Sequence, residues 1–512
     1  MTLQANGYSA QTAAEFISSA TQADIQRPYT AAQVERLTPT LAPTPSNKMA
    51  LSLRAMLGAH RQAFSSTQAL GAADAVTLDA VTKAGGEVAY VSGAALSFAD
   101  TRDPGADLSD YPYDTVARRV AQLTASQAHA AVLNRHLPGF EHRPQIPLIA
   151  DADSGFGLFS TVMKATRGLV DGGVAGFHLD DLLPGSKRFD HAGGRGAVVV
   201  PFAEYSQRLS AAKLQLDMMR SEAVLIGRTD VMDATHITSS VDPVDRPFIL
   251  GASVRMPASY AAFTSPSEAR PEASAADGPG WIAEARLCTL DEAFARATPD
   301  ARLRSVFTVN SIGLNVADAK RVADDLLAGA GLPRLEWDPE AARTTQGWYA
   351  YRGGIDAAIV RSVHAAPLVD MLWACTFQLD LTLARRYASA VKEKFPLKWL
   401  MFNTSHARRA HVALSDDELA ALPQTLGELG YVLTLVPQFG QAAHAYGAFL
   451  GAKATLRGGV GALFDSVLGP YAAATAAPLA SDWYGDMGRV ADAAMDAVGS
   501  GRAGWTGTRG GC

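Results

Sequence analysis

The chain has 512 residues, of which 48% are hydrophobic and 19% are charged, and its net charge is −6. These values are typical of a large globular protein, and the absence of any long basic run argues against a nucleic-acid partner. Three widely spaced cysteines give no disulfide framework, and no run of about 18 apolar residues predicts a membrane span, so we expect a soluble, cytoplasmic protein.

Residues 1–60 read as helical and polar, interrupted by the proline-rich stretch 38–47. We expect this segment to pack on a surface or on a neighbouring subunit rather than to form a core. From residue 61 onward, short apolar runs alternate with segments that are long enough for a helix. The eight runs are 65–72, 87–93, 146–153, 174–181, 223–230, 369–376, 398–403 and 431–437.

Several of these runs are apolar almost without interruption, which is typical of strands buried on both faces of a parallel sheet. Eight such units with intervening helices predict an α/β fold, a (β/α)8 barrel, with a doubly wound open sheet as the alternative. We place the barrel at 61–250 and 335–450. We expect an insertion subdomain at 251–334, with a loop at 264–280 and a helix at 312–331. C-terminal helices are expected at 451–500, and a disordered tail at 501–512.

The ends of three predicted strands are acidic, with Asp151 and Asp153, Asp180 and Asp181, and Asp230. Barrel enzymes carry their chemistry at the C-terminal ends of strands. Carboxylates converging there favour a hard divalent cation such as Mg²⁺. For a single aspartate, the simpler interpretation is a helix N-cap; three strands ending in this way favour the metal site.

The strand end at 223–230 and the one at 87–93 carry groups that suit an acidic substrate. Arg228 can bind a carboxylate with both arms of its guanidinium, although a structural ion pair with a neighbouring aspartate is the alternative. Ser92 and Gly93 offer a hydroxyl and a backbone N–H for a carboxylate or carbonyl oxygen, which alone is a weak signal.

In this order, the motifs resemble those of the isocitrate lyase family, within the isocitrate lyase/phosphoenolpyruvate mutase superfamily. The resemblance runs from about residue 62 to 440 and is most specific over 227–251, GRTDVMDATHITSSVDPVDRPFILG. It implies a (β/α)8 barrel, Mg²⁺, a homotetramer with swapped C-terminal helices, and cleavage of a carbon–carbon bond in a 2-hydroxy tricarboxylate.

Carried over residue by residue, the resemblance implies that the half-site for metal and 2-oxo acid is retained. Its members are the metal-site residues Asp151, Asp153, Asp180 and Asp107, and the substrate-binding residues Ser92, Gly93 and Arg228. Asp180 stands where the family has glutamate, and the tryptophan that follows Ser-Gly in the family is replaced by Ala94.

The half that binds the other product is altered. The family loop Lys-Lys-Cys-Gly-His reads Lys187-Arg188-Phe189-Asp190-His191 here, and a phenylalanine cannot donate the proton that the cysteine is thought to supply. A metal-site glutamate is replaced by Cys375. In the carboxylate clamp, Asn403 and Ser405 remain, while His406 replaces a proline and Ala407 a serine.

These changes predict a Mg²⁺-dependent carbon–carbon lyase, or the reverse aldol-type condensation, on a 2-hydroxy or 2-oxo acid other than isocitrate. Asp190 or His191 would replace the lost proton donor, because both lie on the same loop, and Cys375 is a further candidate. Asp180 would assist beside the metal. The alternatives are carbon–phosphorus chemistry of the phosphoenolpyruvate mutase type and a non-catalytic homologue. Efficient isocitrate cleavage is the least favoured.

Overall fold

The computed structural model describes residues 11–39, 46–100, 102, 109–136, 145–187, 196–267, 271–376, 379–404 and 414–475. Eight parallel strands close into a barrel in the order β1-β13-β12-β11-β6-β4-β3-β2. All eight runs predicted from the sequence become these strands, which confirms the (β/α)8 fold. Their bounds are β1 Thr67–Gly71, β2 Val88–Val91, β3 Leu148–Asp151, β4 Gly176–Leu179, β6 Val224–Thr229, β11 Met371–Ala374, β12 Trp399–Asn403 and β13 Tyr431–Val436.

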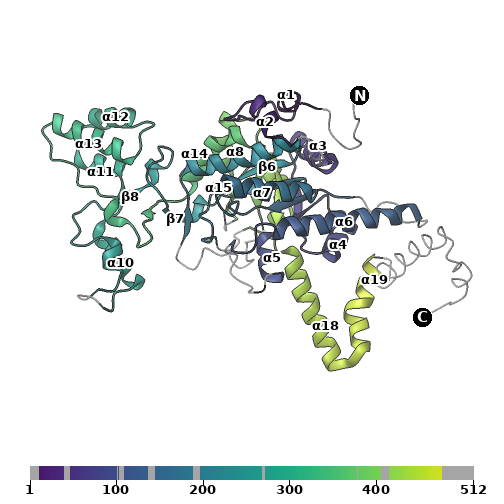
Figure 1. The fold of residues 1–512 in the computed structure, drawn as a ribbon. Coiled ribbons are helices and arrows are strands. Elements are labelled where there is room, and N and C mark those ends of the chain that lie inside the picture. The colour runs from purple at the N-terminus through teal and green to yellow at the C-terminus, as the bar shows by residue number, and fades with distance from the viewer. Residues whose placement is uncertain are drawn as a thin grey trace, which may run out of the picture.

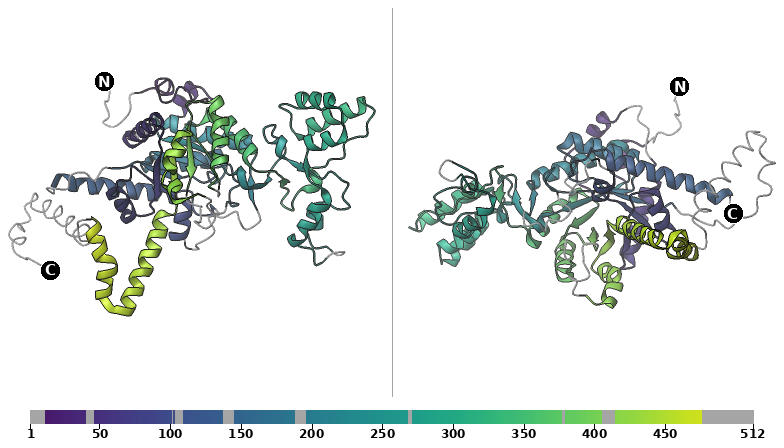
Figure 2. Two further views of the ribbon diagram at one scale, coloured as in Figure 1. Left: turned by 180° about the vertical axis from the view of Figure 1, so that it is seen from behind. Right: turned by 90° about the horizontal axis from the view of Figure 1, so that it is seen from below.

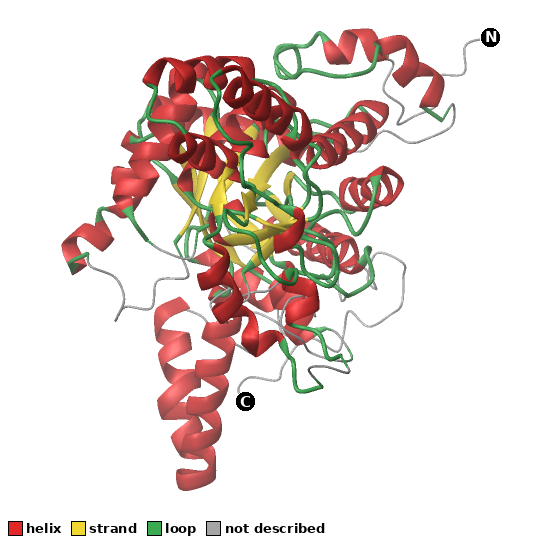
Figure 3. Cartoon of the chain, turned by 90° about the vertical axis from the view of Figure 1, so that its left-hand side faces the viewer, coloured by secondary structure: helices red, strands yellow, loops and turns green. Residues whose placement is uncertain are grey.

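Helices surround the barrel and cover the outer faces of its strands (Figures 1 and 3). They are α4 Ala75–Lys83, α5 Gly93–Ala99, α6 Thr115–His136, α7 Phe159–Asp171, α8 Phe202–Met219, α14 Ile355–Ala365, α15 Leu381–Lys394, α16 Asp416–Ala420 and α17 Leu422–Glu428. Outward side chains such as Phe177 and Leu225 join the large core between strands and helices. Because the strands are apolar on both faces, this outer layer is needed to keep them from water.

The barrel interior is filled by the alternate residues of each strand, including Ile149, Ile226 and Met371. Leu53 and Leu57 of α3 (Lys48–Gln62) are fully buried in the same cluster. The expectation that residues 1–60 lie outside the core is therefore wrong for α3, which supplies apolar side chains to the barrel interior. The shorter α1 (Ala13–Ile17) and α2 (Ala31–Leu37) contact α8.

Residues of the predicted insertion form a lobe beside the barrel (Figures 1 and 2). It contains α9 Tyr260–Phe263, α10 Gly278–Ala285, β9 Cys288–Thr289, α11 Leu290–Ala297, α12 Ala301–Asn310 and α13 Val316–Gly329. The predicted helix at 312–331 is α13. A small sheet of β5 (Ala197–Val199), β7 (Ala234–Ile237) and β10 (Tyr349–Ala350) lies between lobe and barrel, and β8 (Leu250–Gly251) pairs with β9.

The C-terminal part of the described chain is a helical hairpin that projects from the barrel (Figure 1). It comprises α18 (Phe439–Leu463), whose backbone is kinked and non-helical at Gly459, a π-helical segment over Phe464–Leu468 and α19 (Gly469–Thr475). Large apolar side chains on it are exposed, among them Tyr446, Phe449 and Leu456.

Candidate functional site

The strand ends bring the predicted site residues to one mouth of the barrel, and the two-residue period of the strands explains how. Ile226 fills the barrel interior, so Arg228 two residues later points to the same side at the end of β6. The same rule takes β3 from Ile149 to Asp151. On β4 it places Asp180 two residues after the buried His178.

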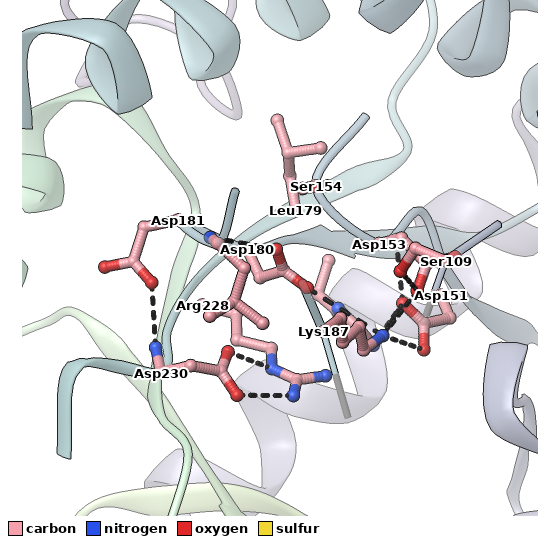
Figure 4. A network of polar contacts seen from close by, with 12 residues as sticks. Ser109, Asp151, Asp153, Ser154, Leu179, Asp180, Asp181, Lys187, Arg228 and Asp230 are labelled. Carbon is pink, nitrogen blue, oxygen red and sulfur yellow. Dashed lines mark hydrogen bonds and ion pairs between the residues drawn. The ribbon is translucent and has the colours of Figure 1, made fainter. Parts of the chain in front are cut away.

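Three buried carboxylates surround one ammonium group at this mouth (Figure 4). Lys187 Nζ lies 2.5 Å from Asp153 Oδ1, 3.1 Å from Asp151 Oδ2 and 3.8 Å from Asp180 Oδ2. Lys187 itself is 2% exposed, so its charge is held by these carboxylates rather than by water. The structure thus confirms that Asp151, Asp153 and Asp180 converge, and it adds a lysine that the sequence reasoning placed only in the loop motif.

The three carboxylates do not carry equal charge. Burial by itself would raise the pKa of Asp151, but Lys187, His178, Arg228 and the backbone N–H of Asp153 together hold the pKa well below its ordinary value. For Asp180, burial dominates and raises the pKa to about 8, and nearby Asp230 adds to the rise. Asp180 Oδ2 also has no hydrogen-bond partner. Near neutral pH the Asp180 carboxyl therefore keeps its proton, whereas Asp151 is ionised beside Lys187.

Hydroxyl groups from two other segments, residues 109–111 and β2, complete the surroundings of the cluster. Tyr111 and Ser109 both donate to Asp153, the latter over 2.8 Å. Tyr90 donates to Asp151 over 3.2 Å, and its oxygen lies 2.7 Å from His178 Nε2. Burial lowers the pKa of His178 to about 3, so its imidazole is neutral.

The sequence reasoning did not single out these hydroxyls, nor His178. Tyr90 precedes Ser92 by two residues and His178 precedes Asp180 by two, so the strand period could have indicated both. For Tyr111 the only signal was its place in DYPYDTV, residues 110–116, one of the stretches that carry the resemblance to the isocitrate lyase family.

Arg228 lies across the mouth and is held in a defined direction. Its Nε and Nη2 each donate to the Asp230 carboxylate over 2.7 Å. The guanidinium carbon also lies 4.5 Å from the centroid of the Trp373 ring. The structural ion pair that was the alternative to substrate binding by Arg228 is therefore present. Nη1 of the guanidinium takes no part in the two hydrogen bonds to Asp230.

The other described candidates lie at neighbouring strand ends. Ser92 is the N-cap of α5 and accepts from Ala95 N–H over 3.1 Å, so Gly93 begins a helix rather than a turn. Asn403 ends β12 and is buried. Cys375 follows β11, and burial raises the pKa of its thiol well above the ordinary value, so the thiol keeps its proton. The candidates Asp107, Asp190, His191, Ser405 and His406 lie outside the described residues.

The donor set fits a divalent metal ion in chemistry. Carboxylate oxygens are the ligands that Mg²⁺ prefers, and a cation would give the unbonded oxygen of Asp180 a partner. Within the described ranges, no three His, Cys, Asp or Glu side chains are gathered tightly enough to form a ready metal centre. We attribute this to Lys187, whose ammonium already lies among the same oxygens.

Comparisons with known proteins show which family the chain is similar to. A model of the isocitrate lyase family matches residues 10–468. The mitochondrial 2-methylisocitrate lyase of Schizosaccharomyces pombe is 32% identical over 434 residues, which cover 82% of each chain. The isocitrate lyase of Oryza sativa subsp. japonica is 32% identical over 458 residues, covering 82% of this chain and 77% of its own.

Among solved structures, the crystal structure of 2,3-dimethylmalate lyase aligns with a TM-score of 0.48 at 17% identity. The alignment covers 89% of this chain and 97% of that one. In the part of the chain that the structure describes, no helix has the length and apolar character needed to span a membrane.

Proposed function

The chain belongs to the isocitrate lyase family, and on this basis we propose that it is a Mg²⁺-dependent carbon–carbon lyase acting on a 2-hydroxy or 2-oxo carboxylic acid. The reverse aldol-type condensation uses the same site. The observation that carries the proposal is the buried cluster of Asp151, Asp153 and Asp180 at the mouth that Arg228 shares. Carboxylates for a metal and a cation for a substrate carboxylate are the two halves of such a site.

In this proposal, Asp151, Asp153 and Asp180 would hold Mg²⁺. When bound, the ion would supply positive charge that stabilises negative charge developing on substrate oxygens. Tyr111 and Ser109 keep the Asp153 carboxylate in place through their hydrogen bonds. Tyr90 does the same for Asp151, and the neutral His178 holds the Tyr90 hydroxyl in turn, so the ligands are oriented before the ion binds.

Arg228 would bind the carboxylate of the 2-oxo or 2-hydroxy acid, because its guanidinium carries a permanent positive charge and is already oriented by Asp230. Ser92 can still donate its hydroxyl proton to a substrate oxygen while accepting from Ala95. Burial keeps Asp180 protonated near neutral pH until a cation arrives, which suits a group that gives up or takes a proton.

Proton delivery to the departing carbon is assigned to Asp190 or His191, with the buried, protonated thiol of Cys375 as the further candidate. Since Phe189 stands where the family places an acidic cysteine, we expect isocitrate cleavage below about one thousandth of a typical family rate. The reason is that losing a positioned general acid costs about 10²–10⁴ in rate. Robust isocitrate turnover by the pure protein would contradict this expectation.

We also propose that the protein forms a homo-oligomer, and a homotetramer by resemblance. The exposed Tyr446, Phe449 and Leu456 on the projecting hairpin support this proposal, because such apolar side chains gain from being covered. Light scattering of the purified protein measures the mass, for which a chain of 53.9 kDa gives the monomer value. A cytoplasmic location stays a prediction.

Titration calorimetry and turnover assays test the activity. Isocitrate, 2-methylisocitrate, dimethylmalate, oxaloacetate, glyoxylate, pyruvate and phosphonopyruvate are each added with and without Mg²⁺. Asp151→Asn removes a charge at the site with little change of shape. Asp171→Asn is the matched control on α7, in an exposed ion pair with Arg167. Binding that needs both Mg²⁺ and intact Asp151 supports the proposal. If Mg²⁺ changes neither binding nor turnover by the wild type, the alternative of a non-catalytic homologue is favoured instead.

A further inference from the structure

Next to the carboxylate cluster lies a second group of charged residues, Asp181 and Arg361, which is fully buried and has no part in the proposed reaction. Asp181 follows Asp180 but points away from Lys187, toward Asp230 (Figure 4). Its Oδ1 accepts the backbone N–H of Asp230 over 2.9 Å, and its Oδ2 accepts the Thr229 hydroxyl over 2.5 Å. One side chain just after β4 therefore fixes the backbone at the end of β6.

The charge of Asp181 is balanced by Arg361, which comes from α14 and is also fully buried. Arg361 Nη1 donates to Asp181 Oδ2 over 2.7 Å. The rest of its fork binds Asp245 Oδ1 over 2.8–2.9 Å and the Val200 carbonyl over 2.8 Å. Because all three arms of the guanidinium are engaged, its position is strongly constrained.

Three successive contacts link Arg361 to Arg228. Arg361 orients Asp181, and Asp181 holds the backbone N–H of Asp230. The Asp230 carboxylate then binds the Arg228 guanidinium in the two-armed geometry described above. A displacement of Asp230 would therefore turn the guanidinium away from its present direction over Trp373.

A buried ion pair is weak grounds for a role in stability, because well-packed apolar residues often serve a fold equally well. Its directional hydrogen bonds do fix geometry, and here they fix the segment that aims Arg228. We propose that Asp181 and Arg361 are positioning residues, which hold the Arg228 guanidinium for the carboxylate of a small 2-oxo acid. This inference rests on the function proposed above.

Arg361→Lys is the decisive variant, since it keeps the charge but loses the fork that binds Asp181 and Asp245 together. Arg386→Lys on α15 is the matched control, because it makes the same change in an exposed ion pair. Its partner Asp356 lies on α14, as Arg361 does. The affinities for Mg²⁺ and for glyoxylate, the smallest 2-oxo acid, are measured by calorimetry, with glyoxylate titrated at saturating Mg²⁺. Thermal midpoints show whether each variant is folded.

We expect Arg361→Lys to weaken glyoxylate binding at least tenfold while the Mg²⁺ affinity and the Arg386→Lys values stay within twofold of the wild type. The selective loss is the important result, because a merely structural role would lower both affinities together. Glyoxylate binding that stays within twofold of the wild type, or a parallel loss for both ligands, would overturn the proposal. If Arg361→Lys does not fold, Asp181→Asn replaces it, with the same expected and contrary results.

Hydrogen exchange of the Asp230 backbone N–H gives a second measurement that needs no ligand. We expect at least tenfold faster exchange in Arg361→Lys and unchanged exchange in Arg386→Lys, because the acceptor of this N–H is Asp181. Unchanged exchange in Arg361→Lys would overturn the positioning role. Failure of the wild type to bind any 2-oxo acid would instead overturn the proposed function, so the two failures are distinguishable.

Discussion

Replacing Gly93 with alanine tests how closely the site is packed. A Cβ on this residue would overlap the Tyr111 hydroxyl oxygen and would lie 3.0 Å from Asp151 Oδ2. Tyr111 is 5% exposed, so its ring cannot swing into solvent, and its hydroxyl is held by Asp153. The substitution must therefore break a buried hydrogen bond to a carboxylate or shift the packing around it.

The magnitude follows from these contacts. Losing a hydrogen bond to a charged partner costs about 1.5–3 kcal/mol, and overpacking a buried site costs about 1–3 kcal/mol. Alanine in place of glycine in a helix returns at most about 1 kcal/mol. Because the two costs overlap, we expect Gly93→Ala to lower the free energy of unfolding by about 2–4 kcal/mol.

The assay is urea unfolding of the metal-free protein followed by circular dichroism. Gly58→Ala in α3 is the matched control, since its Cβ would meet no atom within 4 Å, and we expect it to stabilise the protein by about 0.5–1 kcal/mol. Removing the hydroxyl with Tyr111→Phe should recover part of the loss in the double variant. A Gly93→Ala protein as stable as the wild type would refute the close approach of Tyr111 to this glycine.

Two further predictions concern charges away from the site. Burial, together with Arg61 and Lys398, lowers the pKa of Lys392 to about 8, so the unfolded chain binds more protons between pH 8 and 10.5, and the contribution of Lys392 to stability rises with pH across that window. As the pH is raised from 7.5 to 9.5, the thermal midpoint of Lys392→Met should therefore decrease relative to that of the wild type. A difference that stays constant over this range would contradict the lowered pKa of Lys392. Arg352→Gln breaks a partly exposed ion pair in which two guanidinium nitrogens contact Glu292. In urea unfolding, the free energy of unfolding should fall by less than about 1 kcal/mol. A loss above about 2 kcal/mol would show that the pair is not a surface interaction.

The sequence by itself determined the barrel and much of its chemical character. Strands buried on both faces leave continuous apolar runs, so all eight could be located from local pattern alone. The place of Asp151, Asp180 and Arg228 at strand ends then predicted that they would reach the same mouth, because parallel strands of a barrel all end on one face.

Only the tertiary structure decided which groups meet there. Tyr111 reaches Asp153 across 42 residues and Arg361 reaches Asp181 across 180, and no local pattern encodes such distances. Lys187 was visible as a loop residue, but its position among three carboxylates depends on how the chain returns over the barrel mouth. Strand identity is a property of a few consecutive residues, whereas the charge state of a site depends on burial and on neighbours that the fold brings from elsewhere.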